Sequence, residues 1–161
     1  MTKKHVIYAF SAGGVVFRQA PAADVLVRDA GANSSIEIVI VGHVRENIWT
    51  LPKGTPCPNE TRAETALREV REETGIEARI VGEVGAIEYT FARRGMRFVK
   101  TVFHYLMLAT GGSVELHDHE YDEARWYPYP DVLAMLTYEN ESDMARRAEP
   151  LIRDYLAGEA S

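Results

Sequence analysis

Three glutamates in the middle of the chain have the spacing of a shared binding face. Glu69, Glu72 and Glu73 are related by i, i+3 and i+4, so a helix through this segment presents their carboxylates side by side. Like charges so placed repel, and many such faces are simply solvated. A divalent cation removes the repulsion, and carboxylate oxygens favour magnesium or manganese over zinc. The spacing therefore indicates either a solvated acidic face or a site for a hard cation.

The residues around these glutamates predict a helix with defined ends. Thr61 and Glu64 form an S/T-x-x-E capping box, and Gly75 stands where a left-handed C-terminal cap is expected. Apolar residues recur at helical spacing on one side: Ala63, Ala66, Leu67 and Val70. This narrow stripe can dock on a sheet, which leaves the acidic side free for binding.

The same segment carries a longer pattern that starts at Gly54 and ends at Ile76. It reads GTPCPNETRAETALREVREETGI. It resembles the Nudix box, G-x5-E-x7-R-E-U-x-E-E-x-G-U with U apolar, and it matches at every specified position. A chance match in a chain of this size is expected roughly once in ten million sequences. The residues that lead in, from Trp49 to Lys53, and those from Glu120 to Trp126 also resemble this family.

The resemblance implies a role for each specified residue of the box. It assigns the metal ligands to the acidic face and the preceding turn: Glu69, Glu72, Glu73 and a backbone carbonyl of Lys53 or Gly54. Arg68 is expected to orient the carboxylates, and Glu60 to hold the loop and the helix together. We expect Mg²⁺ as the cofactor, with Mn²⁺ as a substitute. The solvated-face interpretation is thereby disfavoured.

The reaction implied by the resemblance is hydrolysis of a phosphoanhydride bond. Metal ions polarise the phosphates and activate a water molecule, and a carboxylate accepts the proton of that water. Two positions for that base stay open. Glu120 lies six residues before Trp126, a spacing that resembles diadenosine polyphosphate hydrolases of the family, where this glutamate reaches the metal centre. Glu123 is a weaker candidate. The alternative is a glutamate of the helix, Glu72 or Glu69. The neighbouring residues lack a partner cluster and are interpreted as loop residues: His117, Asp118 and His119.

Basic and aromatic residues indicate where a substrate binds. Lys53, in a Pro-Lys-Gly turn, resembles the lysine that lies near the phosphates in dinucleoside polyphosphate hydrolases. The densest basic group suits the far end of a polyphosphate, although a solvated hairpin tip explains it equally: Arg93, Arg94, Arg97 and Lys100. Tyr89 is a candidate to stack on a base, or else a core aromatic. Tyr89 lies closer in sequence to the end of the box than the corresponding tyrosine of the dinucleoside polyphosphate hydrolases does.

Three functions fit these residues. The first is hydrolysis of dinucleoside polyphosphates such as diadenosine tetra- to hexaphosphate. The second is a pyrophosphohydrolase of nucleoside triphosphates that clears oxidised nucleotides such as 8-oxo-dGTP. The third is a Nudix-fold module that binds nucleotides without catalysis. Three repelling carboxylates argue against the third function, because binding alone gives no reason to hold them together.

Length and composition set outer bounds. The 161 residues, 46% hydrophobic and 26% charged, predict one globular domain over 1–161 that contains the box at 54–76. A net charge of −6 argues against a stable nucleic-acid complex. The single cysteine, Cys57, cannot form an internal disulfide, and no apolar stretch can span a bilayer. We therefore expect a cytoplasmic protein with a nucleotide substrate and no membrane contact, and a homodimer stays open.

The elements that position these residues predict an α+β domain. Strands are expected over 36–43, 80–91, 98–108 and 124–127, and two short strand pieces bent at Gly13 and Gly14 over 7–18. Helices are expected over 61–75, 131–136 and 142–156. Residues 92–96 have hairpin character, and 19–35 a loop composition with a short strand at 25–27. Strands around an early helix, closed by C-terminal helices, indicate an α/β/α sandwich. The Nudix fold, a mixed sheet packed between helices, is implied by the resemblance as well.

Overall fold

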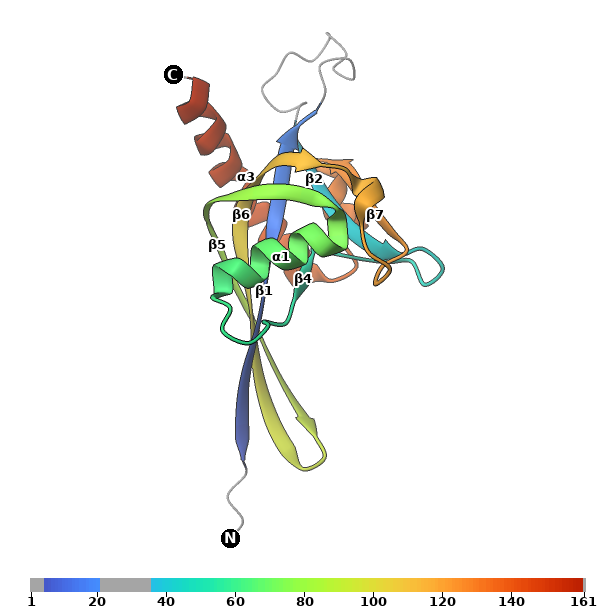
Figure 1. The fold of residues 1–161 in the computed structure, drawn as a ribbon, viewed down its shortest axis with the longest axis vertical. Helices are drawn as coiled ribbons and strands as arrows, with labels where there is room; N and C mark the ends of the chain where they lie inside the picture. Colours follow the sequence, from blue (N-terminus) through green and yellow to red (C-terminus); the bar gives the residue numbers. More distant parts are fainter. Residues whose placement is uncertain (1–4, 21–35, 161) are drawn as a thin grey trace.

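A computed structural model describes residues 5–20 and 36–160, and a mixed sheet forms its centre (Figure 1). The strands are β1 (Val6–Gln19), β2 (Ile36–His43), β3 (Ile48–Thr50), β4 (Lys53–Gly54), β5 (Ile76–Arg93), β6 (Met96–Gly112) and β7 (Glu123–Pro128). Their order is β3-β2-β1-β6-β5, and β4 pairs with β1 while β7 pairs with β2. The β1–β6 pair is parallel and the other pairs are antiparallel.

Helices cover both faces of this sheet. They are α1 (Arg62–Thr74), α2 (Asp131–Met135), α3 (Glu139–Ala160) and the 3-10 turn η3 (Val114–Leu116). Ala66 and Val70 of α1 pack on one face with Val16 of β1, whereas Ile152 of α3 packs on the other face with Phe17. The predicted α+β sandwich is thus confirmed. In the described part of the chain, no helix has the length and apolar content needed to cross a membrane.

Several elements extend beyond the ranges predicted from sequence. The prediction of two strand pieces bent at Gly13 and Gly14 is wrong, because β1 is one strand that pairs with β6 without interruption from Val6 to Phe17. β5 starts at Ile76 and carries register shifts at Glu77/Ala78, Ile80/Gly82 and Glu83/Gly85. Each shift interrupts the alternation of apolar and polar residues, which hides this part of the strand from a periodicity search. α3 begins at Glu139, ahead of the predicted start at 142. The strand predicted at 25–27 and residues 21–35 of the predicted loop lie outside the described residues, while Gln19 closes β1.

A three-stranded arm projects from the body of the molecule (Figure 1). We define the arm as residues 6–11 of β1, 88–93 of β5 and 96–101 of β6. Its hairpin turns at Arg94 and Gly95, whose φ values of 52° and 77° are those of a two-residue I′ turn. Apolar side chains lie at its surface, since Tyr8 is 77% exposed and Phe91 44%. The arm therefore buries less of its apolar surface than the rest of the sheet does.

Candidate metal and phosphate site

Helix α1 has the ends that the sequence predicts. Thr61 Oγ1 accepts a hydrogen bond from the Glu64 N–H at 3.1 Å, and Glu64 Oε1 accepts one from the Thr61 N–H at 3.0 Å. Gly75 closes the helix with a φ of 77°, and its N–H donates to the Arg71 carbonyl. These caps fix the rotation of the helix, and with it the direction in which the acidic residues point.

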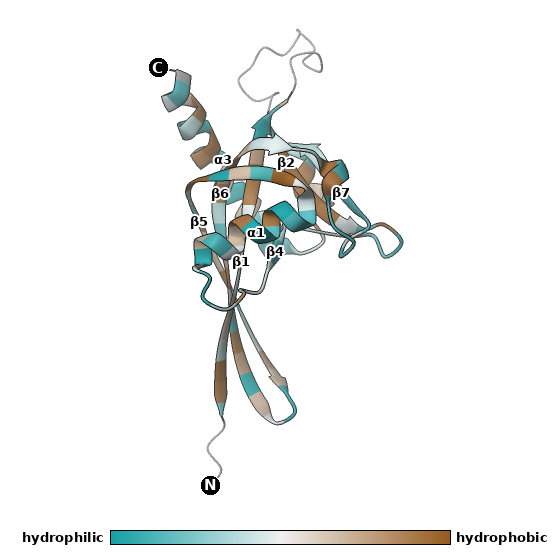
Figure 2. Cartoon of the chain, viewed as in Figure 1, coloured by the Kyte–Doolittle hydropathy of each residue, from teal (hydrophilic) through white to brown (hydrophobic). Residues whose placement is uncertain are grey.

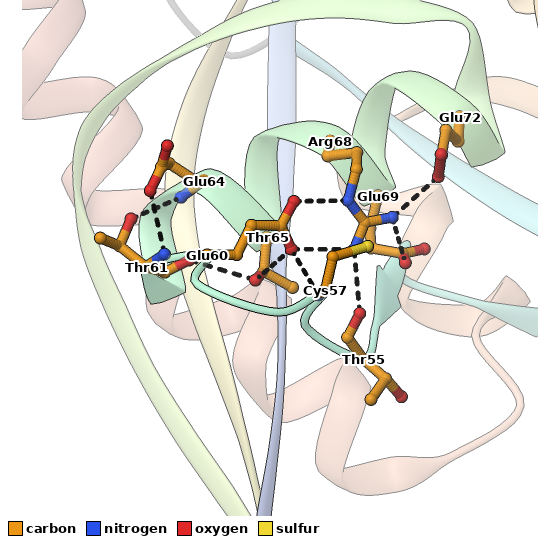
Figure 3. Close-up of polar contacts among 9 residues, drawn as sticks. All are labelled: Thr55, Cys57, Glu60, Thr61, Glu64, Thr65, Arg68, Glu69 and Glu72. Atoms are coloured by element: carbon orange, nitrogen blue, oxygen red, sulfur yellow. Dashed lines mark hydrogen bonds and ion pairs between the residues drawn. The ribbon is translucent and has the colours of Figure 1, made fainter.

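Arg68 connects the acidic residues to the preceding loop (Figure 3). Its Nε donates to Glu60 Oε2 at 2.6 Å. Its Nη1 donates to Glu69 at 2.8 Å and to Glu72 at 2.9 Å, and its Nη2 donates to the Thr55 carbonyl at 2.9 Å. A guanidinium is suited to this because its donors diverge in one plane. Arg68 thus contacts two carboxylates of the acidic face, and its orienting role stays a prediction.

Glu60 holds the loop from its other side. Its Oε1 accepts hydrogen bonds from the Cys57 N–H and from Thr65 Oγ1, each at 2.8 Å. The bond from Arg68, followed by the one from Cys57, lowers the pKa of Glu60 to about 2. Glu60 therefore stays ionised near neutral pH, and its bonds join the loop to the helix.

Three carboxylates converge beyond Arg68. Glu69, Glu73 and Glu120 each have an oxygen within 4.8 Å of the other two. Glu73 is fully buried, and its Oε2 has no hydrogen-bond partner among the described residues. Burial, together with the carboxylates of Glu69 and Glu120, raises the pKa of Glu73. A divalent cation would supply the missing partner and remove the repulsion, so this all-oxygen donor set fits Mg²⁺ or Mn²⁺.

Glu72, also predicted as a ligand, lies outside this trio. Its side chain is 43% exposed and its carboxylate is paired with Arg68. It shares Arg68 Nη1 with Glu69, which belongs to the trio. Glu72 is therefore placed at the border of the site, within reach of solvent.

Glu120 joins the trio from the loop before β7. The Asp118 N–H donates to the Glu72 carbonyl at 2.8 Å, and Asp118 Oδ1 accepts from the Glu120 N–H at 3.0 Å. Burial and the charge of Glu69 raise the pKa of Glu120. Asp118, interpreted from sequence as an ordinary loop residue, thus attaches this loop to the end of α1. Its position two residues before Glu120, typical of an Asx turn, was the available signal.

Two glycines let the β4 strand fit between β1 and α1. A Cβ on Gly54 would lie 2.1 Å from Glu69 Cδ, and one on Gly13 would lie 2.0 Å from the Pro52 carbonyl oxygen. The Lys53 N–H donates to Glu73 Oε1 at 3.3 Å. The backbone of this turn therefore contacts the carboxylates directly, and the carbonyl ligand at Lys53 or Gly54 stays a prediction.

A cleft of about 650 Å³ opens beside the site. Its lining comprises Thr50, Lys53, Tyr89, Tyr138, Glu139, Asn140, Glu141 and Asp143. Lys53 and Tyr89, both predicted to bind substrate, therefore share one cavity. Lys100 pairs with Tyr89 across β5 and β6, and burial together with the charge of Lys53 lowers its pKa. Neither lysine forms an ion pair with a carboxylate in the described part of the chain, although the cleft is also lined by Glu139, Glu141 and Asp143.

The start of α3 adds polar groups that the sequence analysis did not identify. Asn140 Nδ2 donates to the Tyr89 hydroxyl at 3.1 Å, while its Oδ1 is buried without a partner among the described residues. Glu141 is 1% exposed, and its Oε1 accepts from the Leu51 N–H at 3.4 Å. Burial raises the pKa of Glu141 to about 7. Both acceptors were missed because the helix was expected to begin only after them.

The predicted basic group is divided along the arm. Lys100 lies at its base, on the face that carries Tyr89. Arg97 pairs with Ala92 and Val6, on the opposite face, while Arg93 and Arg94 stand at the turn. Lys100 is therefore placed beside the cleft, whereas the three arginines lie at the far end of the arm, and their contact with substrate stays a prediction.

Residues 18–153 match the NUDIX domain. The chain belongs to the Nudix family. A candidate mutator protein of Mycobacterium tuberculosis, MutT4, is 36% identical over 154 residues, which cover 94% of this chain and 58% of that Nudix relative. The asymmetrical bis(5'-nucleosyl)-tetraphosphatase of the mouse is 39% identical over 102 residues, covering 58% of this chain and 65% of the mouse enzyme. The chain thus spans less than two thirds of either relative.

A solved structure shares the fold of this Nudix chain. The crystal structure of a C. elegans Ap4A hydrolase superposes with a TM-score of 0.61 and 20% sequence identity. The match covers 91% of this chain and 99% of the C. elegans protein. The mixed sheet between helices is therefore the Nudix fold, as the motif implied.

Proposed function

We propose that this Nudix protein is a divalent-metal-dependent hydrolase that cleaves a phosphoanhydride bond in a nucleoside diphosphate derivative. The observation that carries the proposal is the trio of Glu69, Glu73 and Glu120, in which a buried carboxylate oxygen has no partner. Mg²⁺, or Mn²⁺ in its place, would be held by these residues with Glu72 at the border. Once bound, the metal would supply charge neutralisation at the phosphates and an activated water.

The residues of the chain then have separate tasks in the proposed reaction. Lys53 and Lys100 bind the phosphate chain, and Arg68 with Glu60 keeps the acidic face in place. Glu120 is the proposed base. It is the exposed member of the trio and comes from a loop rather than from α1, so it can take a proton and release it to solvent.

A dinucleoside polyphosphate is the first proposed substrate. Lys53 lies beside the carboxylate trio, and Lys100 lies at the base of the arm. Together they extend the site toward the arm, which suits a phosphate chain that is longer than one metal ion can bind. The mouse relative is named for this class of substrate, and so is the C. elegans protein that shares the fold.

A nucleoside triphosphate is the second candidate, and a specific observation favours it. Asn140 Oδ1 and the Glu141 carboxylate place two hydrogen-bond acceptors at the same cleft. The adjacent N–H donors of a guanine edge would satisfy both, whereas an adenine offers one amino group beside a ring acceptor. The name of MutT4 agrees with a nucleotide-pool role.

The experiment is a hydrolysis screen of the purified protein with Mg²⁺ against diadenosine tetraphosphate, dGTP, 8-oxo-dGTP, ADP-ribose and capped RNA. Highest kcat/KM on diadenosine tetraphosphate supports the first substrate. Highest kcat/KM on a guanine triphosphate, lost in Asn140→Leu and kept in Glu159→Gln, an exposed change on α3 outside the cleft, supports the second. Hydrolysis of none of these nucleotides would instead leave a nucleotide-binding module.

A further inference from the structure

The outer edge of β1 in the arm has unpaired backbone groups. β1 pairs with β6 along one edge from Val6 to Phe17, but on its other edge β4 and β2 begin only at Ala12 and Phe17. The Arg97 N–H donates to the His5 carbonyl, so odd-numbered residues of the arm face β6. The N–H and C=O groups of Val6, Tyr8 and Phe10 therefore point away from β6, and no described strand accepts them.

This edge also lacks the features by which proteins usually block strand pairing. Residues 6–11 read VIYAFS, with no charge, proline or glycine, and the Tyr8 side chain is 77% exposed. The opposite edge of the arm, in β5, carries Glu88 and Arg93. Figure 2 shows the contrast, with the β1 part of the arm coloured as hydrophobic and the hairpin tip as hydrophilic. Charges and prolines are the common guards of free edges, so only the β1 edge is a template for pairing.

We propose that two copies of this chain pair through the free β1 edges of their arms, and that each arm places its basic tip beside the β4 turn of the other copy. The occupant is a second copy because an antiparallel pair of identical strands is self-complementary about a twofold axis. Tyr8 then faces Tyr8, and Val6 faces Phe10 of the second copy, so that the even-numbered residues bond one another.

The position of the tip follows from this register. β4 occupies the same edge of β1 directly after the free segment, with Gly54 paired to Ala12 and Lys53 to Gly13. With Tyr8 facing Tyr8, the antiparallel β1 of the second copy therefore has its first described residue, His5, opposite Ser11, one position before the pair of Ala12 and Gly54. Its own β6 lies one strand further out, since Arg97 pairs with Val6. The turn at Arg94 and Gly95 of the second copy is thereby placed level with Lys53 and Gly54.

In the proposed dimer the arginines at the tip of the arm can bind substrate at the site of the other copy, which they cannot do within one chain. None of Arg93, Arg94 and Arg97 forms an ion pair with a carboxylate within the described ranges, and all three lie far along the arm from their own cleft. In the dimer their charge adjoins the site of the other copy, where it complements a polyphosphate. This second half of the proposal rests on the proposed function, whereas the pairing of the arms does not.

The pairing is tested by the solution mass of the full chain, measured by light scattering after size exclusion. Tyr8→Pro removes an N–H that faces away from β6, so the fold of one chain should survive. Tyr8→Lys is a second variant, and Thr90→Lys is its matched control because it adds the same charge to the other edge of the arm. We expect a dimer for the wild type and Thr90→Lys, and half that mass for both Tyr8 variants. A monomeric wild type, or a dimer in every variant, overturns the pairing.

Dimers of two different variants test whether the tip arginines of one copy contribute to hydrolysis at the site of the other. One subunit carries Arg93→Ala and Arg94→Ala with intact carboxylates, and the other carries Glu73→Gln, which inactivates its own site, with an intact tip. Co-expression should raise kcat/KM per intact site about fivefold over the tipless homodimer, and Tyr8→Pro in both subunits should abolish the gain. No gain overturns the role of the tip while the mass measurement stands. A wild type that hydrolyses no nucleotide overturns the proposed function and the role of the tip, but not the dimer.

Discussion

The backbone N–H of Lys53 donates to the buried Glu73 carboxylate at 3.3 Å, which joins the β4 turn directly to the acidic face of α1. The side chain of Lys53 lines the cleft, so one residue contacts both the proposed metal site and the proposed phosphate site. The backbone of Lys53 is therefore held against the proposed metal site, while the residue also lines the cleft.

Arg68→Lys should weaken this arrangement although it keeps the charge. Lysine lacks the planar set of donors that bonds Glu60, Glu69 and Thr55 together. We expect kcat to fall by about 100-fold and the free energy of unfolding by about 1–3 kcal/mol, measured by steady-state kinetics and urea denaturation. Arg71→Lys, an exposed change on the same helix, is the control. Equal kinetics for the two variants would remove Arg68 from the site.

Glu120→Gln should identify the base. A group that takes a proton in the transition state matters more to turnover than to ground-state binding, so kcat should fall by roughly 100-fold to 10,000-fold with a much smaller change in KM. Glu123→Gln is the matched control, since Glu123 pairs with Arg125 outside the trio. If the two variants keep similar kcat values, the base belongs to α1, at Glu72 or Glu69.

Glu141 should make stability depend on pH. Its folded-state pKa of about 7 lies above the ordinary value of 4.5, so its contribution to stability is complete below pH 4.5 and is lost as the pH rises through 7. Glu141→Gln keeps an acceptor for the Leu51 N–H but cannot ionise. Above pH 7 the variant should therefore exceed the wild type in free energy of unfolding by up to roughly 3 kcal/mol.

Urea denaturation between pH 5 and 8 checks this expectation, with the exposed change Glu139→Gln as the control. Glu73 and Glu120, whose pKa values are also raised, are present in all three proteins, so their titration cancels in the comparison. Parallel stability profiles for the wild type and Glu141→Gln would contradict the assignment of a raised pKa to Glu141.

Much of the site could be predicted from sequence because it is local. The caps of α1, the bonds of Arg68 to Glu60 and Glu69, and the acidic face all lie within one loop and one helix, where spacing determines position. Glu120 could also be predicted as a site residue, from its spacing to Trp126. The carboxylate trio, in contrast, depends on how a distant loop attaches to α1, which the Asp118 hydrogen bonds decide.

The cleft and the arm could not be predicted because they arise from pairing between distant segments. Asn140 and Glu141 reach the cleft only because α3 starts before the apolar pattern does. The basic residues near position 97 form one cluster in sequence, yet the alternation of a strand puts Arg97 and Lys100 on opposite faces. Register, which a single sequence does not reveal, separates the lysine at the cleft from the arginines at the tip.

The central claim is that the buried carboxylate of Glu73 supports metal-dependent hydrolysis. The most direct measurement is the initial rate at which the wild type and Glu73→Gln, each with Mg²⁺, hydrolyse the best nucleotide substrate of the screen. The exposed change Glu77→Gln is the control. We predict that EDTA abolishes wild-type and control activity and Mg²⁺ restores it, while Glu73→Gln loses about 1,000-fold or more in kcat with an unchanged or higher Tm, because a neutral amide replaces a buried acid. A Glu73→Gln variant that keeps near-wild-type kcat with Mg²⁺, or a wild type equally active in EDTA, would contradict the account.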